Sequence, residues 1–287
     1  MNPQFEFNLP ANNTTEPGQV GIFESAITLM KCRECNTFFN TVNSELVDHC
    51  FYCNSKDVYN AGVVNTFKDY SVIPFEKDLS FAIKEYKKRV TINPIIPLIF
   101  RKKQTIQSLA KLFIPCKLYQ VRASGSIIVA GENIPINKDY NNIIVTNYRN
   151  LENDFLSIND YDISKLTSFT NEHLKDCVYI EGNIEQNILN EKVQKEVLRH
   201  AIIDVKKDVK SVINKVDTTN LGVTTISEKD ILVPVYLLNI KEEDKNTIFL
   251  LNGQNGHTTF KPPIGKKELI ICIGIILLLI ILLIIVF

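Results

Sequence analysis

The sequence predicts an α+β protein with a cysteine-rich module near its start, a mixed and mainly antiparallel sheet domain with helices, and a single C-terminal transmembrane helix. Three observations predict this architecture: two Cys-x-x-Cys pairs lie close together, strand-like and helix-like segments alternate along the middle of the chain, and the last nineteen residues carry no charge. The expected boundaries are 1–22 for a flexible tail, 23–60 for the cysteine-rich module, 61–262 for the α+β domain, 263–268 for a spacer and 269–287 for the membrane anchor.

The overall composition is that of a folded chain without a strong charge bias. Hydrophobic residues make up 45% of the 287 residues, which is enough for a sizeable core. Lys+Arg and Asp+Glu both number 32, and this balance argues against a protein that coats nucleic acid, because such proteins usually carry a basic excess. The first 20 or so residues are polar, so we expect a mobile tail and no secretory signal peptide. The cysteines are therefore expected in a reducing compartment, where such pairs favour metal over disulfides.

The two Cys-x-x-Cys motifs are the most specific signal in the sequence. Cys32 and Cys35 are separated from Cys50 and Cys53 by fourteen residues, which is long enough for one hairpin. Four thiolates arranged in this way can surround one tetrahedral Zn²⁺. An asparagine directly follows each pair, at a position where tight turns tolerate Asn. We therefore predict a structural four-cysteine zinc ribbon, with a redox dithiol as the other functional interpretation of the motif.

The surface of the predicted ribbon gives little indication of its partner. His49 directly precedes Cys50, but four thiolates already complete a zinc coordination shell, so we expect His49 outside the ligand set. Residues 24–56 contain three basic and four acidic side chains, which is not a basic footprint. The four aromatic residues of this region could stack on nucleic-acid bases, but a small core or a docking face is the favoured interpretation.

Helical periodicity predicts three helices in the middle of the chain. Asp78 can cap a helix whose apolar stripe runs to Val90. A second helix is expected over 105–113, and a third over 191–216, where valines keep to one side. We expect the third helix to pack on the domain's own sheet, with coiled-coil pairing as the alternative. Nine basic and two acidic residues lie between 77 and 111; such a run is typical of a solvated face, and beside a membrane anchor it could also meet anionic headgroups.

Strand-like segments account for much of the remaining central chain. Apolar runs bounded by turn residues predict strands over 118–130, 142–148, 230–240 and 246–251. The turn NGQNG at 252–256 predicts a hairpin, because Asn-Gly pairs supply the positive φ that hairpin turns need. The sequence contains no Gly-rich phosphate loop, no GxSxG, no HExxH and no Cys–His or carboxylate pair at motif spacing. We therefore predict no catalytic residues and no enzymatic activity.

The C-terminal stretch 269–287, LIICIGIILLLIILLIIVF, predicts a membrane-spanning helix. Nineteen residues at ~1.5 Å each span about 28 Å, close to the ~30 Å of a bilayer's hydrocarbon core. A buried core helix is the alternative, but it would need apolar partners on every face. Lys261, Lys266 and Lys267 precede the segment, and the positive-inside rule then places the preceding domain in the cytosol. We predict a tail-anchored, single-pass membrane protein whose N-terminal domain lies in the cytoplasm.

Several further segments occur in a recognisable order around these features. They are VIPF at 72–75, LFIPCKLY at 112–119, ISKLTSF at 163–169 followed by Leu174, LVPVYLL at 232–238 and NGQNG at 252–256. Together with the four cysteines, this order resembles a bacterial family of TFIIB-type zinc-ribbon-containing membrane proteins over roughly residues 30–265. Lys117 and Tyr236 stand where that family usually has Trp, and Asn255 and His257 where it more often has Thr and Lys. The resemblance implies the architecture and the zinc ribbon, and it implies no particular reaction.

These observations predict a membrane-tethered zinc-ribbon interaction module that faces the cytosol and recruits a protein partner. Its one cofactor would be a structural Zn²⁺, and its partners the membrane and a cytosolic protein. The alternative is a membrane-bound nucleic-acid-binding or transcription-type regulator, indicated by the ribbon and by the basic run. An enzyme with an unfamiliar site in the central domain is the third hypothesis.

Overall fold

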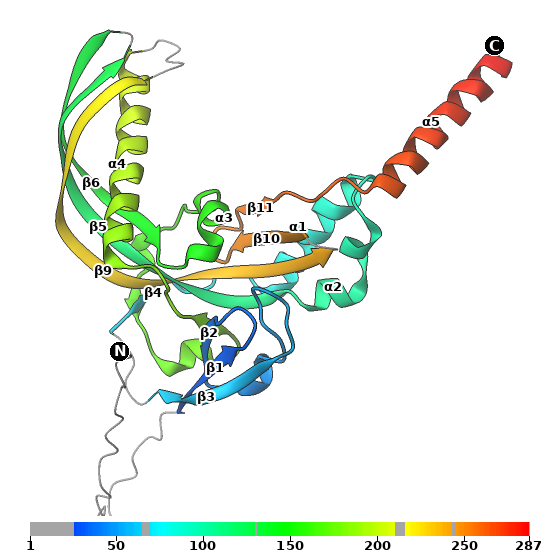
Figure 1. Cartoon of the computed structure of the whole chain (residues 1–287), viewed down its shortest axis with the longest axis horizontal. Helices are drawn as coiled ribbons and strands as arrows, with labels where there is room; N and C mark the ends of the chain where they lie inside the picture. Colours follow the sequence, from blue (N-terminus) through cyan, green and yellow to red (C-terminus); the bar gives the residue numbers. More distant parts are fainter. Residues whose placement is uncertain (1–25, 65–68, 130, 210–215, 243–244, 287) are drawn as a thin grey trace, which may run out of the picture.

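The computed structural model describes residues 26–286, apart from 65–68, 130, 210–215 and 243–244. The predicted tail, 1–22, lies outside this part of the chain. The described residues confirm a mixed α+β protein with a mostly antiparallel sheet, five α-helices, a cysteine cluster near the N-terminal end and one apolar C-terminal helix (Figure 1).

The sheet is built from eleven strands. They are β1 (Ile27–Cys32), β2 (Phe38–Thr41), β3 (Val58–Val64), β4 (Ser71–Val72), β5 (Ala110–Val129), β6 (Glu132–Thr146), β7 (Thr167–Ser168), β8 (Val178–Ile180), β9 (Val216–Glu242), β10 (Lys245–Asn252) and β11 (Thr258–Phe260). The helices are α1 (Leu79–Ile92), α2 (Lys103–Gln107), α3 (Glu152–Leu156), α4 (Gln186–Val209) and α5 (Lys266–Val286), and Leu98–Arg101 forms a 3₁₀ turn.

The strand order places the cysteine-bearing strands and the C-terminal helix at opposite edges of one sheet. The order is β11-β10-β9-β5-β8-β2-β1-β3, with β6 paired to β5, and with β4 paired to β7 and β9. Only the pairs β4·β9 and β5·β8 are parallel among the described pairs. β1, β2 and β3 carry or flank the cysteine pairs and join the central sheet through β2·β8, whereas α5 follows β11 at the other edge (Figure 1).

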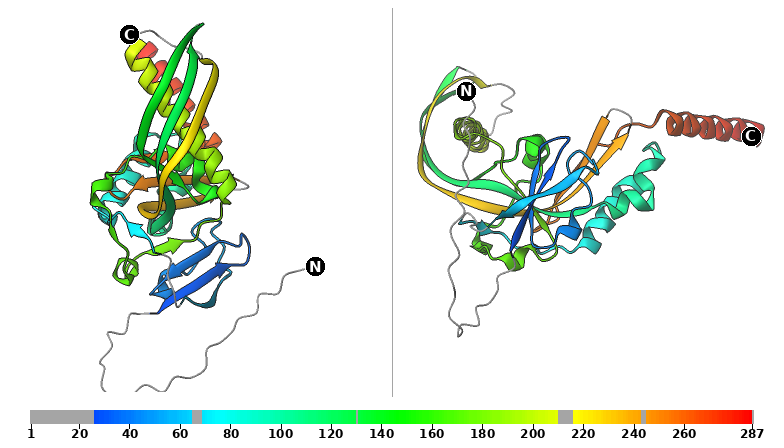
Figure 2. Two further views of the ribbon diagram at one scale, coloured as in Figure 1. Left: turned by 90° about the vertical axis from the view of Figure 1, so that its left-hand side faces the viewer. Right: turned by 60° about the horizontal axis from the view of Figure 1, so that its bottom comes forward.

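A long three-stranded arm extends from the central sheet. β5, β6 and β9 curve together away from the body, and α4 lies along the concave side of the arm (Figures 1 and 2). Val193, Val197 and Val205 of α4 are buried in one cluster with Val121 of β5 and Ile143 of β6. This packing confirms that α4 covers the domain's own sheet.

Two predicted elements differ in the structure. The helix predicted over 105–113 is wrong: α2 ends at Gln107, and β5 begins at Ala110. The reason is that consecutive side chains there are buried on both faces of a central strand, with Leu112 in one core cluster and Phe113 in another. The apolar run therefore lacks the alternation that usually identifies a strand. The helix predicted over 191–216 starts five residues earlier, at Gln186, and is described as far as Val209. Residues 210–215 lie outside the described part of the chain, and Val216, the last residue of the prediction, begins β9 instead.

Other local predictions hold. Asp78 caps α1, because its side chain accepts a hydrogen bond of 2.7 Å from the backbone N–H of Phe81. The strand expected over 230–240 is present as part of the much longer β9. The Asn-Gly turn joins β10 to β11 as an antiparallel hairpin, with Gly256 at a φ of +85°.

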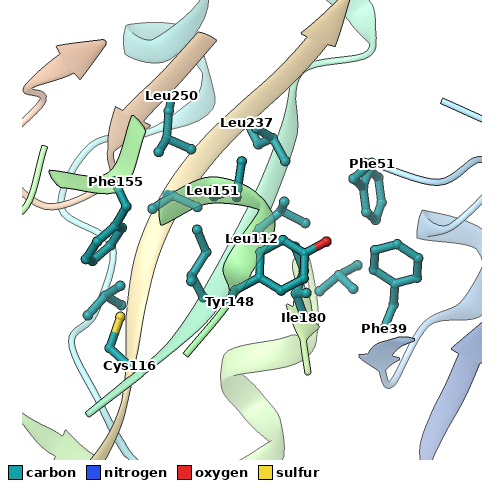
Figure 3. Close-up of a cluster of buried hydrophobic side chains, with 14 of the residues drawn as sticks. Phe39, Phe51, Leu112, Cys116, Tyr148, Leu151, Phe155, Ile180, Leu237 and Leu250 are labelled. Carbon is teal, nitrogen blue, oxygen red and sulfur yellow. The ribbon is translucent and has the colours of Figure 1, made fainter. Parts of the chain in front are cut away.

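The cysteine module shares its core with the sheet domain. Phe39 and Phe51 of the module pack edge to face, with ring centroids 5.3 Å apart. They belong to the same buried cluster as Leu112, Ile180 and Leu237 of the central strands (Figure 3). This continuous core holds the module on the body of the molecule.

Candidate metal centre

Two turns of the same design present the cysteines. Each Cys-x-x-Cys pair is followed by an asparagine in the left-handed region, Asn36 at φ 57° and Asn54 at φ 62°. The same pair of backbone hydrogen bonds closes each turn. In the first turn, the N–H of Cys32 donates to the Thr37 carbonyl (3.0 Å) and the N–H of Asn36 to the Cys32 carbonyl (3.1 Å). In the second, the N–H of Cys50 donates to the Ser55 carbonyl (2.8 Å) and the N–H of Asn54 to the Cys50 carbonyl (2.8 Å). The turns therefore aim both sulfur pairs at a common point.

All four predicted ligands meet at that point. The Sγ atoms of Cys32, Cys35, Cys50 and Cys53 lie within 4.8 Å of one another. The Sγ atoms of Cys32 and Cys53 are 3.6 Å apart, and those of Cys35 and Cys50 are 3.5 Å apart. A metal with four sulfur ligands at ~2.3 Å in a tetrahedron has edges of about 3.8 Å, so these separations fit one central ion. The cluster is positioned to bind a metal ion.

The electrostatics of the cluster also suit a cation. Burial raises the pKa of the Cys50 thiol far above its ordinary value and raises the pKa of Cys53 to about 11. Burial acts in the same direction on Cys35, but hydrogen bonds with Thr37 outweigh it and lower the net pKa of this thiol. Grouped thiolates in a partly buried site need a nearby positive charge, which a bound divalent ion supplies.

Residues outside the motif surround the cluster, and sequence reasoning did not find them. Thr37 places its hydroxyl 3.2 Å from Cys35 Sγ and 3.2 Å from the hydroxyl of Tyr148. Tyr148 also packs edge to face on Tyr52, with ring centroids 6.2 Å apart. Because Thr37 and Tyr148 are separated by 111 positions, no local signal in the sequence could have paired them.

His49 lies beside the cluster and outside it. Its Nδ1 faces the carboxylate of Asp48, and its ring packs edge to face on Phe51 with centroids 5.4 Å apart. The group of candidate ligands consists of the four cysteines alone. His49 therefore packs on the module next to the cluster and is not one of its candidate ligands.

A groove of about 1200 Å³ separates the cysteine module from the sheet domain. The module contributes Asp48, His49 and Phe51 to one wall, and the other wall includes Lys111 and Asp176. Lys111 and Asp176 form an ion pair of 2.6 Å across this wall. The groove is thus a mixed polar and apolar surface, and its shape depends on the position of the module.

The end of β9 lines this groove and lacks a paired strand on one edge. The pairing of β5 with β9 ends at Ala110 and Leu237, whereas β9 continues to Glu242 and pairs there with β10 on its other side. Residues 238–242 of β9 consequently have one edge without a paired strand among the described residues. Asn239 of this segment is buried, its Nδ2 donates to the carbonyl of Tyr52, and its Oδ1 has no hydrogen-bond partner in the described part of the chain.

The NGQNG turn that resembles a family motif has a structural role. Asn252 is fully buried; its Nδ2 donates to the carbonyls of Ile158 (2.9 Å) and Asp160 (3.2 Å). Gln254 bonds both backbone groups of Asp162, accepting from its N–H at 2.8 Å and donating to its C=O at 3.1 Å. The turn therefore clamps the loop 158–162 onto the sheet and leaves few polar groups free for a ligand.

The C-terminal helix is exposed along its length. α5 is long and apolar enough to cross a membrane, and its apolar window is not buried against any other described element. This exposure confirms the sequence-based exclusion of a buried core helix.

Comparisons with family models, with curated proteins and with solved structures gave no match for this chain. The functional assignment therefore depends on the geometry of the cysteine cluster, the groove and α5.

Proposed function

We propose that this protein is a membrane-tethered zinc-ribbon adaptor that faces the cytosol and recruits a protein partner without catalysing a reaction. The observation that carries this proposal is the groove between the cysteine module and the open end of β9. An extended segment of a partner can add to such a strand edge, as in other complexes that form by β-augmentation.

Zinc is the metal that best suits the cluster. Four sulfur donors with near-tetrahedral spacing match the closed structural sites of Zn²⁺, which leave no open position for a substrate. When bound, the ion would neutralise the thiolates and hold the two turns together. Cys32, Cys35, Cys50 and Cys53 would be its ligands.

The orientation of the anchor supports a cytosolic location for the sheet domain. Lys266 and Lys267 form the first turn of α5 and are exposed, so the positive-inside rule favours the cytosolic side for everything that precedes the helix. Because the cysteine module is at the opposite edge of the sheet from α5, it would project away from the bilayer.

A protein partner explains the module better than nucleic acid does. Two of its cations are engaged within the module: Arg33 pairs with Asp57 at 3.2 Å, and Lys31 lies over the ring of Phe38. The groove borders the unpaired edge of β9 at residues 239–241, whose backbone groups are acceptors and donors suited to a peptide chain.

A matched pair of variants on β9 tests recruitment by the groove. Lys241→Trp places a bulky ring at the groove, and Ile226→Trp places the same ring at an exposed position on the same strand outside it. Proteins captured by the full chain in detergent should be lost with Lys241→Trp and retained with Ile226→Trp. An identical set of captured proteins for both variants would refute the groove as the docking site, and steeply salt-dependent oligonucleotide binding would support the nucleic-acid regulator instead.

A further inference from the structure

We infer that the loop between α1 and α2 is a second membrane contact, which lies on an anionic bilayer surface beside the point where α5 enters. This inference rests on the proposed membrane tether and adds a specific lipid-binding surface to it. The surface, called here the collar, comprises residues 92–103 together with residues 264–267.

The first turn of α5 is bonded to the collar loop. The backbone N–H of Gly265 donates to the carbonyl of Ile95 at 2.8 Å, and the backbone N–H of Leu98 donates to Glu268 Oε1 at 3.1 Å. Gly265 is buried in this contact, and a Cβ atom there would meet the carboxylate of Glu268 and lie 3.2 Å from the Ile95 carbonyl oxygen. α5 leaves the body next to α1 and α2 in both figures (Figures 1 and 2). Insertion of α5 therefore brings this loop to the level of the lipid headgroups.

The collar holds the most exposed large apolar side chains of the described body. Outside α5, the highest exposed fractions are those of Ile92 (71%), Ile264 (63%) and Leu98 (62%), and the next is Val63 at 55%. Leu98 and Ile264 adjoin the hydrogen bonds that join the loop to α5, and Ile92 ends α1 three residues before Ile95. The helix α5 that begins there is itself exposed and apolar. Apolar groups clustered in this way, beside a membrane segment, are typical of side chains that enter the headgroup and acyl boundary.

The charge of the collar is strongly positive although the chain as a whole is neutral. Arg101, Lys102 and Lys103 follow one another at the end of the loop, and Lys266 and Lys267 begin α5. None of these five cations forms an ion pair with another residue that the structure describes. Their complement is a negatively charged surface, and the cytosolic leaflet provides one.

The guanidinium of Arg101 is held in place within the collar. Its Nη2 donates to the carbonyl of Asn93 at 2.9 Å, which fixes the side chain over the end of α1. Its Nε is buried and has no acceptor among the described residues.

The absence of tryptophan from the chain gives a direct test. Leu98→Trp and Ile92→Trp each add a single fluorophore to the collar, and Val63→Trp adds one at an exposed apolar position of the cysteine module. Each full-length variant is reconstituted into vesicles that contain phosphatidylglycerol and phosphatidylcholine brominated near the headgroup end of its acyl chains. We expect quenching and a blue shift of the fluorophores at 92 and 98, and neither at 63.

Two further experiments distinguish membrane binding by the collar from membrane insertion of α5. Flotation of the unmodified chain with uncharged phosphatidylcholine vesicles at high salt reports on α5, because electrostatic binding by the collar is suppressed there. Failure to float would overturn the membrane tether, whereas flotation with unquenched fluorophores at 92 and 98 on the anionic vesicles would overturn the collar only. Lys102→Glu with Lys103→Glu, in the Leu98→Trp background, should reduce quenching on anionic vesicles. The same change at Lys206 and Lys207, exposed on α4, should not. Equal quenching in both double variants would contradict an electrostatic contact with the headgroups.

Discussion

The hydroxyl of Thr37 lies 3.2 Å from that of Tyr148, and this contact connects the cysteine cluster to the centre of the sheet domain. Thr37 also touches Cys35 Sγ, and Tyr148 is almost fully buried among residues from both parts of the molecule (Figure 3). Tyr148 shares its buried cluster with Phe51, which lines the groove, so we expect a change in the geometry of the cysteine cluster to reach that wall. We therefore expect metal binding to affect the shape of the proposed docking site.

Tyr148→Phe should weaken metal retention. The substitution removes the buried hydrogen bond with Thr37 and a longer, partly buried one from Asn150 Nδ2, at a cost of about 1 kcal/mol or more in the free energy of unfolding. We expect faster release of the metal to a chelator. Tyr86→Phe is the matched control, because its hydroxyl donates at 2.7 Å to the carbonyl of Phe100 far from the cysteines along the chain. The control should lose similar stability with an unchanged release rate; equal release rates in both variants would contradict the coupling.

Asn252→Ala should strongly destabilise the sheet domain. The side chain is fully buried and satisfies two carbonyls and two backbone N–H groups, of Gln254 and Asn255, so its removal leaves buried groups unpaired. At roughly 1–3 kcal/mol for each unsatisfied buried group, the loss should be about 3 kcal/mol or more. Thermal unfolding in detergent should show a much smaller effect for Asn255→Ala, whose side chain is exposed. A similar small effect for both would mean that the NGQNG turn does not clamp the loop 158–162.

Removal of residues 266–287 should transfer the chain from the membrane to the soluble fraction. Nothing else among the described helices is long and apolar enough to span a bilayer. Cell fractionation of the shortened and full-length chains measures the expected transfer to the soluble fraction directly. In the full-length chain, a cysteine-reactive label that cannot cross membranes should reach a cysteine introduced at exposed Lys195 only after the cell membrane is permeabilised. Labelling of intact cells from outside would contradict the cytosolic orientation.

Acid should destabilise the packing of α4 on the arm through His200. Burial of the His200 ring, and then the charge of Arg199, lower its pKa in the folded state, whereas the carboxylates of Glu196 and Asp204 act in the opposite direction. As pH falls below about 6.5, the unfolded chain takes up a proton that the folded chain does not, so stability falls with pH from the unfolded pKa towards the folded one. The free energy of unfolding of His200→Gln should lose this part of the pH dependence. An identical pH profile for the variant and the parent would refute the assignment.

The sequence predicted the features whose residues are near one another in the chain. The four cysteines lie within twenty-two positions, and the spacing of their pairs was sufficient to predict a shared site. The capping of α1 by Asp78 and the apolar α5 are local in the same way. In contrast, residues 110–113 were predicted to be helical, because a strand buried on both faces has no period of two to reveal it.

The groove and the collar could not be predicted, because they depend on contacts between distant residues. The open edge of β9 exists because β9 extends beyond the start of β5, and this depends on the register between Ala110 and Leu237. The collar depends on the hydrogen bond between Leu98 and Glu268, two residues that are 170 positions apart in the sequence. The basic residues in both segments were visible in the sequence, but their common location was not.

Elemental analysis of the full-length chain, purified in detergent without chelator, tests the central claim most directly. The account predicts one zinc per chain in the parent protein and in Cys272→Ser, and little or none in Cys50→Ser, because Cys272 lies in α5 and Cys50 belongs to the cluster. A parent protein that contains no metal, with the four cysteines free or oxidised, would contradict the zinc ribbon and would favour a redox role for the two Cys-x-x-Cys pairs.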